Sequence, residues 1–422
     1  MIGVGEWGPL PYGSDGGGAA PASSGEDRAA LTVLVSVSGI GPITLERLLV
    51  AFGSAPNVLA VAAAPNGARS LIAATADPEG LRRAMAAPVA AAIVDAAARR
   101  DAILEGIARL GLEVVFLGDA AYPSRLRAIE LPPAALFVRG DAAILGAAHA
   151  VAVVGTRRPT DAGRRTANRI GAALARAEAL VVSGLAIGID GAAHAATLEA
   201  GGRTVAFIGS GHDRLFPAVH DRLAAAIVER GGAVVSEYPP DTEATKGTFP
   251  RRNRLISGAA DAVVVVEAGA RSGALLTASW ALEQGRECFL VPGPIDAPMS
   301  AGCLGFLRDW PGVTRVVAGI PQLLDDLGLP GAAGLPARPA DAGRGVSSSV
   351  AAASPGAVLT ARAPGDEAVG RAVLAGAATV DELVAVTTLT VPAVLRSLTR
   401  LEAAGLVQAR AGRYLPAGSL AA

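Results

Sequence analysis

The densest group of chemically active side chains in this sequence is an arginine cluster in TFPRRNRLISG (248–258). Arg251, Arg252 and Arg254 flank Asn253 in this segment. Guanidinium groups bind phosphate oxygens through paired hydrogen bonds, so the cluster predicts a phosphate-binding site. Cations near the start of a helix also oppose the helix dipole, which indicates that an anion belongs beside them. The alternative is a charged helix start that faces water.

A glycine-rich turn, GTRRPT (155–160), could add to such a site. Gly155 lets the backbone approach a ligand, Thr156 can cap a helix, and Arg157 supplies a cation. The dinucleotide-binding pattern G-x-G-x-x-G is absent at this turn, so a nicotinamide cofactor is not expected. An anion site does not depend on that pattern.

The turn SGLAIGID (183–190) contains Ser183, Gly184 and Gly188. Free N–H groups at the start of a helix attract a phosphate, so this turn predicts a second part of the anion site. The alternative is that the two glycines serve only a tight turn.

Acidic side chains near these turns raise the question of catalysis. Glu267, in a third glycine-rich turn with Ser272, is the main candidate among these acidic residues for a functional role. Asp190 and His194 are four residues apart, a spacing that favours a structural pair on one helical face. A hydrolase built from Ser183, His194 and Asp190 is the alternative, but the G-x-S-x-G pattern of such a nucleophile is missing.

Metal and disulfide chemistry are not expected. The spacing of His212, Asp213 and His220 matches no standard set of metal ligands, and a fourth ligand is missing. Cys288 and Cys303 are the only cysteines, which excludes a disulfide framework and fits a reducing compartment.

Short apolar runs that alternate with helical patterns surround the glycine-rich turns. Because these runs are almost continuously apolar, the sheet must be buried on both faces, which predicts a parallel, doubly wound α/β domain. Ligands bind such sheets at the carboxyl ends of the strands, where the turns lie. The six runs are AVAVVG (150–155), LVVSG (180–184), RTVAFIGSG (203–211), AVVSEYP (233–239), DAVVVVEAG (261–269) and ECFLVPG (287–293).

Changes in composition and in the spacing of apolar residues divide the chain into five parts. Residues 1–28 are predicted to be a disordered leader, and residues 29–110, with alanine and leucine at helical spacing, a small helical domain. The α/β domain is expected over 111–328. Residues 329–364, rich in Ala, Gly, Pro and Ser, predict a flexible linker, and 365–418 predict a compact tail.

The tail has the outline of a winged helix. One helix is expected near residues 367–374, and a second begins after Thr379, with Glu382 in the register of a capping box. A third helix follows Thr390, and a two-stranded hairpin turns near Gly412.

The overall composition limits the partners of the protein. With 422 residues and a net charge of −1, a nucleic-acid surface would have to be local. Aromatic residues are 4% of the chain, so a nucleic acid would be held mainly through its phosphates and with little sequence preference. No uncharged apolar run of about 18 residues and no basic signal-peptide start is present. We therefore expect a cytoplasmic protein with no membrane partner.

These segments together resemble the DNA-processing protein A family, also called DprA or Smf. The resemblance covers about residues 112–310 almost continuously, and more weakly the helical N-terminal region resembles the family's SAM-like or helix-hairpin-helix domain and the tail its winged helix. The matching stretches are VAVVGTRRPT, VVSGLAIGIDGAAHAATLEAGGRTVAFIGSGHDRLFP, SEYPP, FPRRNRLISGAADAVVVVEA, RSGALLTASWALEQGRECFLVPG, the following SAGC, and YPSRLRAIELPPAALFVRGD (122–141).

The resemblance implies an extended Rossmann-like domain that binds single-stranded DNA, protects incoming strands and loads the RecA recombinase during natural transformation. It also implies a homodimer formed through this domain, and no catalysis. Two positions depart from the family pattern. Ile187 stands where a basic residue is usual, which removes one cation, and Leu304 replaces the usual Asn after Gly-Cys. The family's site residues carry over to Gly155, Thr156, Arg157, Ser183, Gly184, Gly188, Arg252, Asn253 and Arg254.

Two other functions are open on the sequence. A nucleotide phosphoribohydrolase also places glycine-rich turns around a phosphate, but it requires a P-G-G-x-G-T-x-x-E segment where this chain has EAGARSGALLTA (267–278). A transcription regulator would bind DNA through the winged helix, for which Arg396 and Arg400 are compatible.

Overall fold

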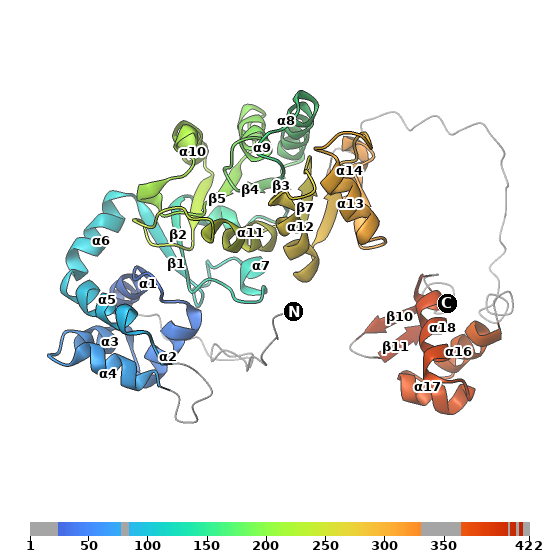
Figure 1. Cartoon of the computed structure of the whole chain (residues 1–422), viewed down its shortest axis with the longest axis horizontal. Helices are drawn as coiled ribbons and strands as arrows, with labels where there is room; N and C mark the ends of the chain where they lie inside the picture. Colours follow the sequence, from blue (N-terminus) through green and yellow to red (C-terminus); the bar gives the residue numbers. More distant parts are fainter. Residues whose placement is uncertain (1–23, 77–83, 331–363, 404–405, 411–412, 417–422) are drawn as a thin grey trace. The chain divides into compact units, whose positions relative to one another are not determined.

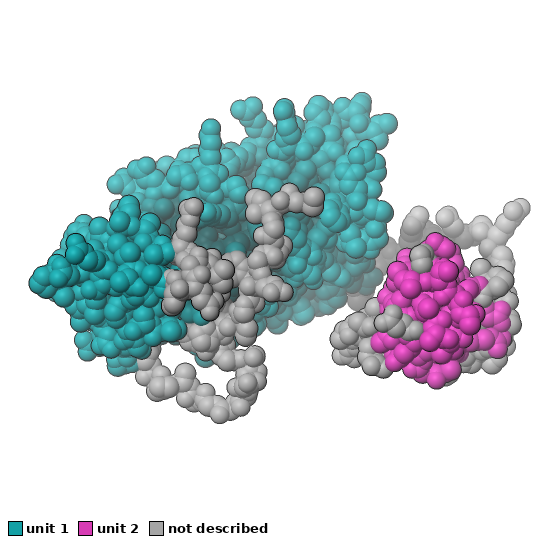
Figure 2. Space-filling model, turned by 60° about the horizontal axis from the view of Figure 1, so that its bottom comes forward, with its two compact units in different colours: residues 1–335 teal, residues 336–422 magenta. Residues whose placement is uncertain are grey.

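The computed structural model describes residues 24–76, 84–330, 364–403, 406–410 and 413–416. The chain forms two compact units, residues 1–335 and 336–422, which Figure 2 distinguishes by colour. The expected linker falls almost entirely outside the described residues, as does the leader up to residue 23. Each unit is described by itself.

A nine-stranded sheet, in the order β1-β2-β6-β5-β4-β3-β7-β8-β9, forms the centre of the first unit (Figure 1). The seven strands from β6 to β9 in this order are parallel, and β2 and β1 extend the sheet antiparallel. The strands are β1 (Leu112–Phe116), β2 (Ala135–Gly140), β3 (Ala150–Val154), β4 (Leu180–Ser183), β5 (Thr204–Phe207), β6 (Ala233–Ser236), β7 (Ala262–Val265), β8 (Glu287–Leu290) and β9 (Thr314–Val316).

Helices cover both faces of this sheet because successive side chains of each strand point to opposite sides. Val151 and Val153 pack with α8, α9 and α14, whereas Ala152 and Val154 pack with α11, α12 and α13. The predicted doubly wound sheet is therefore confirmed, and each of the six apolar runs contains a strand. The covering helices are α7 (Ser124–Arg127), α8 (Asp161–Arg176), α9 (Ile189–Glu199), α10 (Asp221–Glu229), α11 (Thr248–Gly258), α12 (Ala274–Glu283), α13 (Ala301–Asp309) and α14 (Ile320–Asp326).

The N-terminal helices pack against the antiparallel end of the sheet. Their core is continuous with Val114 and Phe116 of β1 and with Phe137 of β2, so they share a unit with the sheet. The first helix begins at Gly25, four residues before the expected boundary, because Ser24 and Asp27 form a capping box. The helices are α1 (Gly25–Val35), α2 (Pro42–Phe52), α3 (Ala55–Ala62), α4 (Gly67–Ala74), α5 (Ala87–Ala98) and α6 (Arg100–Arg109).

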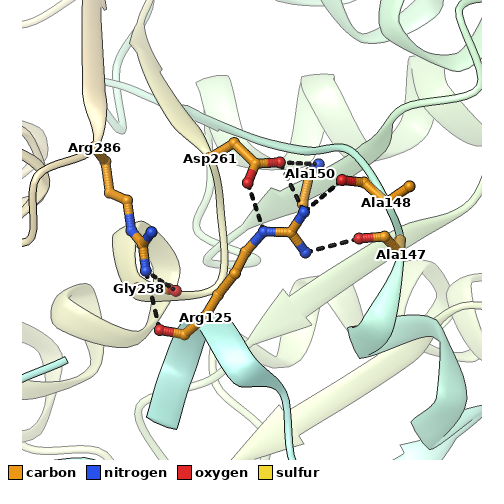
Figure 3. Close-up of polar contacts among 7 residues, drawn as sticks. All are labelled: Arg125, Ala147, Ala148, Ala150, Gly258, Asp261 and Arg286. Atoms are coloured by element: carbon orange, nitrogen blue, oxygen red, sulfur yellow. Dashed lines mark hydrogen bonds and ion pairs between the residues drawn. The ribbon is translucent and has the colours of Figure 1, made fainter. Parts of the chain in front are cut away.

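A polar cluster closes the edge of the sheet where β3 and β7 begin (Figure 3). Arg125 of α7 donates from Nε and Nη2 to the two carboxylate oxygens of Asp261, at 2.6 and 2.9 Å. Its remaining bonds go to the carbonyls of Ala147 and Ala148, at 2.7 and 2.6 Å. Asp261 also accepts from the backbone of Ala150, the first residue of β3. The cluster therefore fixes α7 to the start of two neighbouring strands.

The described residues of the second unit form three helices and a hairpin around their own apolar core. Thr379 and Glu382 form the predicted capping box at the start of the second helix, and Leu383 and Leu398 are buried between the helices. These elements match the expected outline, while the winged-helix assignment stays a prediction. The predicted turn at Gly412 lies outside the described residues. The elements are α16 (Pro364–Leu374), α17 (Val380–Thr387), α18 (Val391–Ala403), β10 (Val407–Arg410) and β11 (Arg413–Pro416).

No single helix in the described parts of the chain is both long and apolar enough to cross a membrane. One strongly bent pair, α2 with α3, meets the criterion by length and composition.

Candidate nucleic-acid interface

A pocket of about 790 Å³ lies at the point where the order of the strands reverses. Strands β3 and β7 are neighbours there, although they are far apart in sequence. The residues after these two strands line the pocket together with the start of α11. Open parallel sheets bind ligands at this position because the two flanking loops diverge. Of the predicted site residues, Gly155, Thr156, Arg157, Arg252, Asn253 and Ser272 line it.

Glycines allow the turns around the pocket to pack directly against one another. A side chain at Gly155 would meet Ile189 at 2.6 Å, and Gly188 has a φ of 97° that other residues rarely adopt. A side chain at Gly188 would also collide with the backbone of Thr156. The glycines therefore serve loop packing here, which the sequence analysis had given as the alternative at Gly188.

Two backbone amides beside the pocket are occupied within the protein. The N–H of Thr156 donates to the carbonyl of Glu267 at 2.7 Å, and the N–H of Gly184 donates to Asp190 at 3.1 Å. The hydroxyl of Ser183 donates to the carbonyl of Val153 at 2.6 Å. The predicted free amide is therefore wrong at Gly184, and because the amide of Thr156 is used as well, a ligand must rely on side chains there.

Arg252 forms the inner wall of the pocket. Its side chain is 4% exposed, and Nη1 donates to the carbonyls of Gly184 and Phe207 at 2.5 and 2.6 Å. Burial lowers the pKa of Arg252 to about 10, although the nearby carboxylate of Asp190 acts in the opposite direction. Arg252 thus joins the ends of β4 and β5, and its buried Nε is left without a partner among the described residues.

The aromatic ring of Phe249 is close to two cations of the site, Arg157 and Arg252. The guanidinium of Arg157 is 5.0 Å from the ring centre of Phe249, and that of Arg252 is 6.0 Å from it. Phe216 stacks on Phe249 at a tilt, with 5.6 Å between ring centres. Arg157 is exposed, and Phe216 is 47% exposed. A cation and an aromatic face are therefore presented to solvent side by side.

The arginine cluster divides between two cavities. Arg252 and Asn253 face the main pocket, whereas Arg251 and Arg254 line a separate cavity of about 460 Å³ beside the turn after α1. Arg254 pairs with Glu237 at 2.6 Å, and both side chains are largely buried. Arg251 and Arg254 are three residues apart on a helix and so share a face. The predicted single cluster is therefore wrong in its geometry.

The candidate catalytic groups have structural partners. Asp190 accepts from Gly184, while Nδ1 of His194 lies 2.7 Å from the hydroxyl of Thr204. That hydroxyl donates to a backbone carbonyl, so Nδ1 of His194 is the donor to it. The predicted Asp190–His194 pair and the hydrolase triad are both wrong, because each member has another partner. Burial lowers the pKa of His194 to about 3, which keeps the ring neutral.

Glu267 fixes the start of α8. It accepts from the backbone and the hydroxyl of Thr160, at 2.9 and 2.7 Å, and its own carbonyl accepts from Thr156. The carboxylate therefore serves the structure of the turn. No group of three or more potential metal ligands occurs in the described part of the chain. His212 and His220 instead bond to the backbone carbonyls of Phe137 and Leu185.

Comparison with known proteins identifies the family. The profile of the DNA recombination-mediator protein A family matches residues 113–325, half of the chain. The chain belongs to this family. The DNA processing protein DprA of Bacillus subtilis is 40% identical over 206 residues, which cover 49% of this chain and 69% of that protein. The matched region includes the whole pocket.

Solved structures of DprA proteins resemble this chain as well. The DprA of Streptococcus pneumoniae is 31% identical and superposes with a TM-score of 0.56 over 71% of this chain and 97% of that one. The DprA of Helicobacter pylori, whose structure is described in terms of its single-stranded DNA binding mode, is 27% identical with a TM-score of 0.47 over 52% of this chain and 97% of that one.

Proposed function

We propose that this DprA-family chain binds single-stranded DNA in the pocket at the strand reversal, with little dependence on base sequence. The observation that carries the proposal is the placement of Arg157, Phe249 and Arg252. Arg157 comes from the turn after β3, Phe249 and Arg252 come from α11, and all three line one cavity of about 790 Å³. Membership of a DNA recombination-mediator family supports the same function.

The aromatic pair favours a single strand over a duplex. A base can stack on the exposed ring of Phe216 only if it is not already stacked and paired inside a double helix. Stacking tolerates every base because each has a flat face, while Arg157 and Arg158 at the pocket wall attract phosphates without regard to sequence. The two kinds of group together suit an unpaired strand.

We further propose that the protein acts without catalysis, since Asp190, His194 and Glu267 are engaged in the structural bonds described above. The family resemblance leads us to include loading of the RecA recombinase during natural transformation, a homodimer formed through the α/β domain, and a cytoplasmic location. We also keep the division into a helical domain (29–110), a DNA-binding domain (111–328) and a winged helix (365–418) as part of the proposal.

The test is a titration of labelled single and double strands at two salt concentrations. The wild-type protein should prefer the single strand at both. Arg157→Ala should weaken that binding about tenfold, since a hydrogen bond to a charged group contributes about 1.5 kcal/mol. The slope of log affinity against log salt should fall by about 0.7, the value for one phosphate of a single strand.

Arg69→Ala, an exposed arginine on α4, is the matched control and should leave affinity and slope unchanged. Equal binding of single and double strands would contradict the proposal, as would an unchanged slope in Arg157→Ala. Release of free base from nucleoside monophosphates would favour the phosphoribohydrolase instead.

A further inference from the structure

Helix α8 carries an exposed row of arginines that begins next to the pocket. Arg164, Arg165, Arg169 and Arg176 are all exposed, against a single acid, Asp161, in the same helix. None of the ion pairs found among the described residues involves these four arginines. Figure 1 shows α8, in dark green, beside α9 on one face of the sheet. The row is therefore a strongly cationic surface outside the pocket.

Three of the arginines lie along one line of the helix. Arg165 and Arg169 are four residues apart, and Arg176 follows seven residues later, so all three lie on the same face. At 1.5 Å per residue, the row extends about 6 Å from Arg165 to Arg169 and about 16 Å to Arg176. The opposite face, with Ile170 and Leu174, is buried against the sheet. The row can therefore contact an extended ligand without disturbing the core.

These charges do not help the helix to form. Like charges four residues apart repel each other, as Arg165 and Arg169 do. Arg164 and Arg165 also lie close to the N-terminus of α8, where cations oppose the helix dipole. An external polyanion would relieve both effects. A solvated cationic face with no ligand is the competing explanation, and the experiment below separates the two.

The row follows closely in sequence on residues that line the proposed DNA site. Arg157 and Arg158 line the pocket, and α8 begins three residues after Arg158. The connection is fixed, because Thr160 at the start of α8 is bonded to Glu267 of the opposite turn. Arg164 and Arg165 are therefore the next cations along the chain after Arg158.

We propose that the exposed face of α8 guides the single strand as it leaves the pocket, with Arg165 and Arg169 binding successive parts of its phosphate backbone. The inference rests on the proposed function and extends it, because it gives the strand a path out of the pocket and a longer contact than the pocket alone provides. Short strands should then use only the pocket, and longer strands should also use α8.

The experiment measures the affinity of poly-thymidine oligonucleotides of about 4 to 16 nucleotides, the range of site sizes known for single-strand binding folds. The protein is the full chain, as wild type and as the double variant Arg165→Ala/Arg169→Ala. The variant should bind the shortest strands like wild type. For the longest strands its salt slope should be lower by about 1.4, that is, 0.7 for each of two phosphates.

Two controls address charge and folding. Arg165→Lys/Arg169→Lys keeps the charges and should retain most of the slope, whereas Arg69→Ala/Arg308→Ala removes two exposed arginines elsewhere and should leave every length unaffected. Circular dichroism should show the same helix content in all variants, since the replaced side chains are exposed.

The outcomes separate this inference from the proposed function. If the double variant binds long strands with an unchanged slope, α8 does not guide the strand, while the pocket can still bind it. Equal losses at every length would also overturn the inference, because they would place both arginines in the pocket itself. If wild type binds no strand of any length, the proposed function itself fails.

Discussion

Arginine has different roles at the two ends of the parallel strands, that is, at the side of the sheet where the strands begin and at the side where they end. At the edge where the strands begin, Arg125 donates four hydrogen bonds to a carboxylate and two backbone carbonyls. At the edge where they end, Arg157 is exposed and faces the ring of Phe249. A guanidinium that donates most of its hydrogen bonds inside the protein stabilises the fold, whereas an exposed one can bind a ligand. The comparison therefore separates arginines that hold the structure from those available for function.

Arg252 is the strongest test of this comparison, because it stands at the ligand edge but is bonded like a structural residue. Arg252→Ala should lower the free energy of unfolding by about 4 kcal/mol, since it leaves two buried carbonyls without a donor and a cavity where the buried side chain lay. Urea unfolding measures this loss. Binding of single strands by the folded fraction should also fall more than tenfold.

A variant that loses affinity but keeps its stability would break the comparison, because a buried arginine would then serve the ligand alone. Arg252→Lys provides the graded control. It keeps a charge, but its ammonium ends one bond short of the position of Nη1, which donates to both carbonyls, so it should lie between alanine and wild type in stability.

Arg125→Ala tests the opposite edge. The side chain of Arg125 is 15% exposed and that of Asp261 46%, so part of the pair is screened by water, and we expect a stability loss of about 3 kcal/mol. Affinity for single strands should be unchanged. Arg99→Ala, whose pair with Asp95 is exposed, is the matched control and should cost less than about 0.5 kcal/mol. An affinity loss in Arg125→Ala would show that the two edges are coupled.

His194 offers a test by pH. Its pKa is lowered from 6.5 to about 3 by burial, so the folded protein keeps the ring neutral while the unfolded chain takes up a proton below pH 6.5. His194 should therefore lower the stability as the pH falls from 6.5 toward 3, by about 1.4 kcal/mol per unit, or about 2 kcal/mol at pH 5, and the buried His212 should add a comparable loss. Urea unfolding at pH 7 and pH 5 measures the difference.

His194→Asn, whose amide can replace the donor to Thr204, should reduce this pH dependence. If the variant shows the full loss between pH 7 and pH 5, another group causes it. His212, which is also buried with a pKa lowered to about 4, is the first to examine.

The smallest effect is expected from removal of the second unit. That unit has its own core, so a chain that ends before Gly365 should keep the fold of the first unit and its affinity for single strands within about twofold. Fluorescence anisotropy with the truncated and full chains measures this. A large loss of binding would favour the transcription regulator and move the primary DNA contact to the C-terminal unit.

The sequence predicted the sheet well because its central strands are almost continuous runs of valine and alanine. Strand β9 was not predicted, since it has three residues and includes Arg315. β1 and β2 were not predicted as strands either, because they lie outside the regular alternation of strand and helix and pair antiparallel. Regular patterns reveal the central parallel strands, whereas β1 and β2 do not repeat them and β9, although parallel, is too short to show a pattern.

The site was predicted by residue type but not by contact. The sequence placed Arg157 and Arg252 at the correct edge, because glycine-rich turns after parallel strands meet there. It could not show that Thr156 donates to Glu267, since that bond joins turns about a hundred residues apart and depends on how β3 and β7 align. The division of Arg251 and Arg252 between two cavities, in contrast, follows from helical periodicity and was accessible to sequence reasoning.

The bond network between Thr156, Thr160 and Glu267 ties the loops after β3 and β7 into one rigid rim. A rim of this kind has little freedom left to lose when a strand arrives, so free and occupied forms should superpose closely at these residues. Association with DNA should then require no slow rearrangement of the protein. Differences in affinity between oligonucleotides should arise mainly from their dissociation rates.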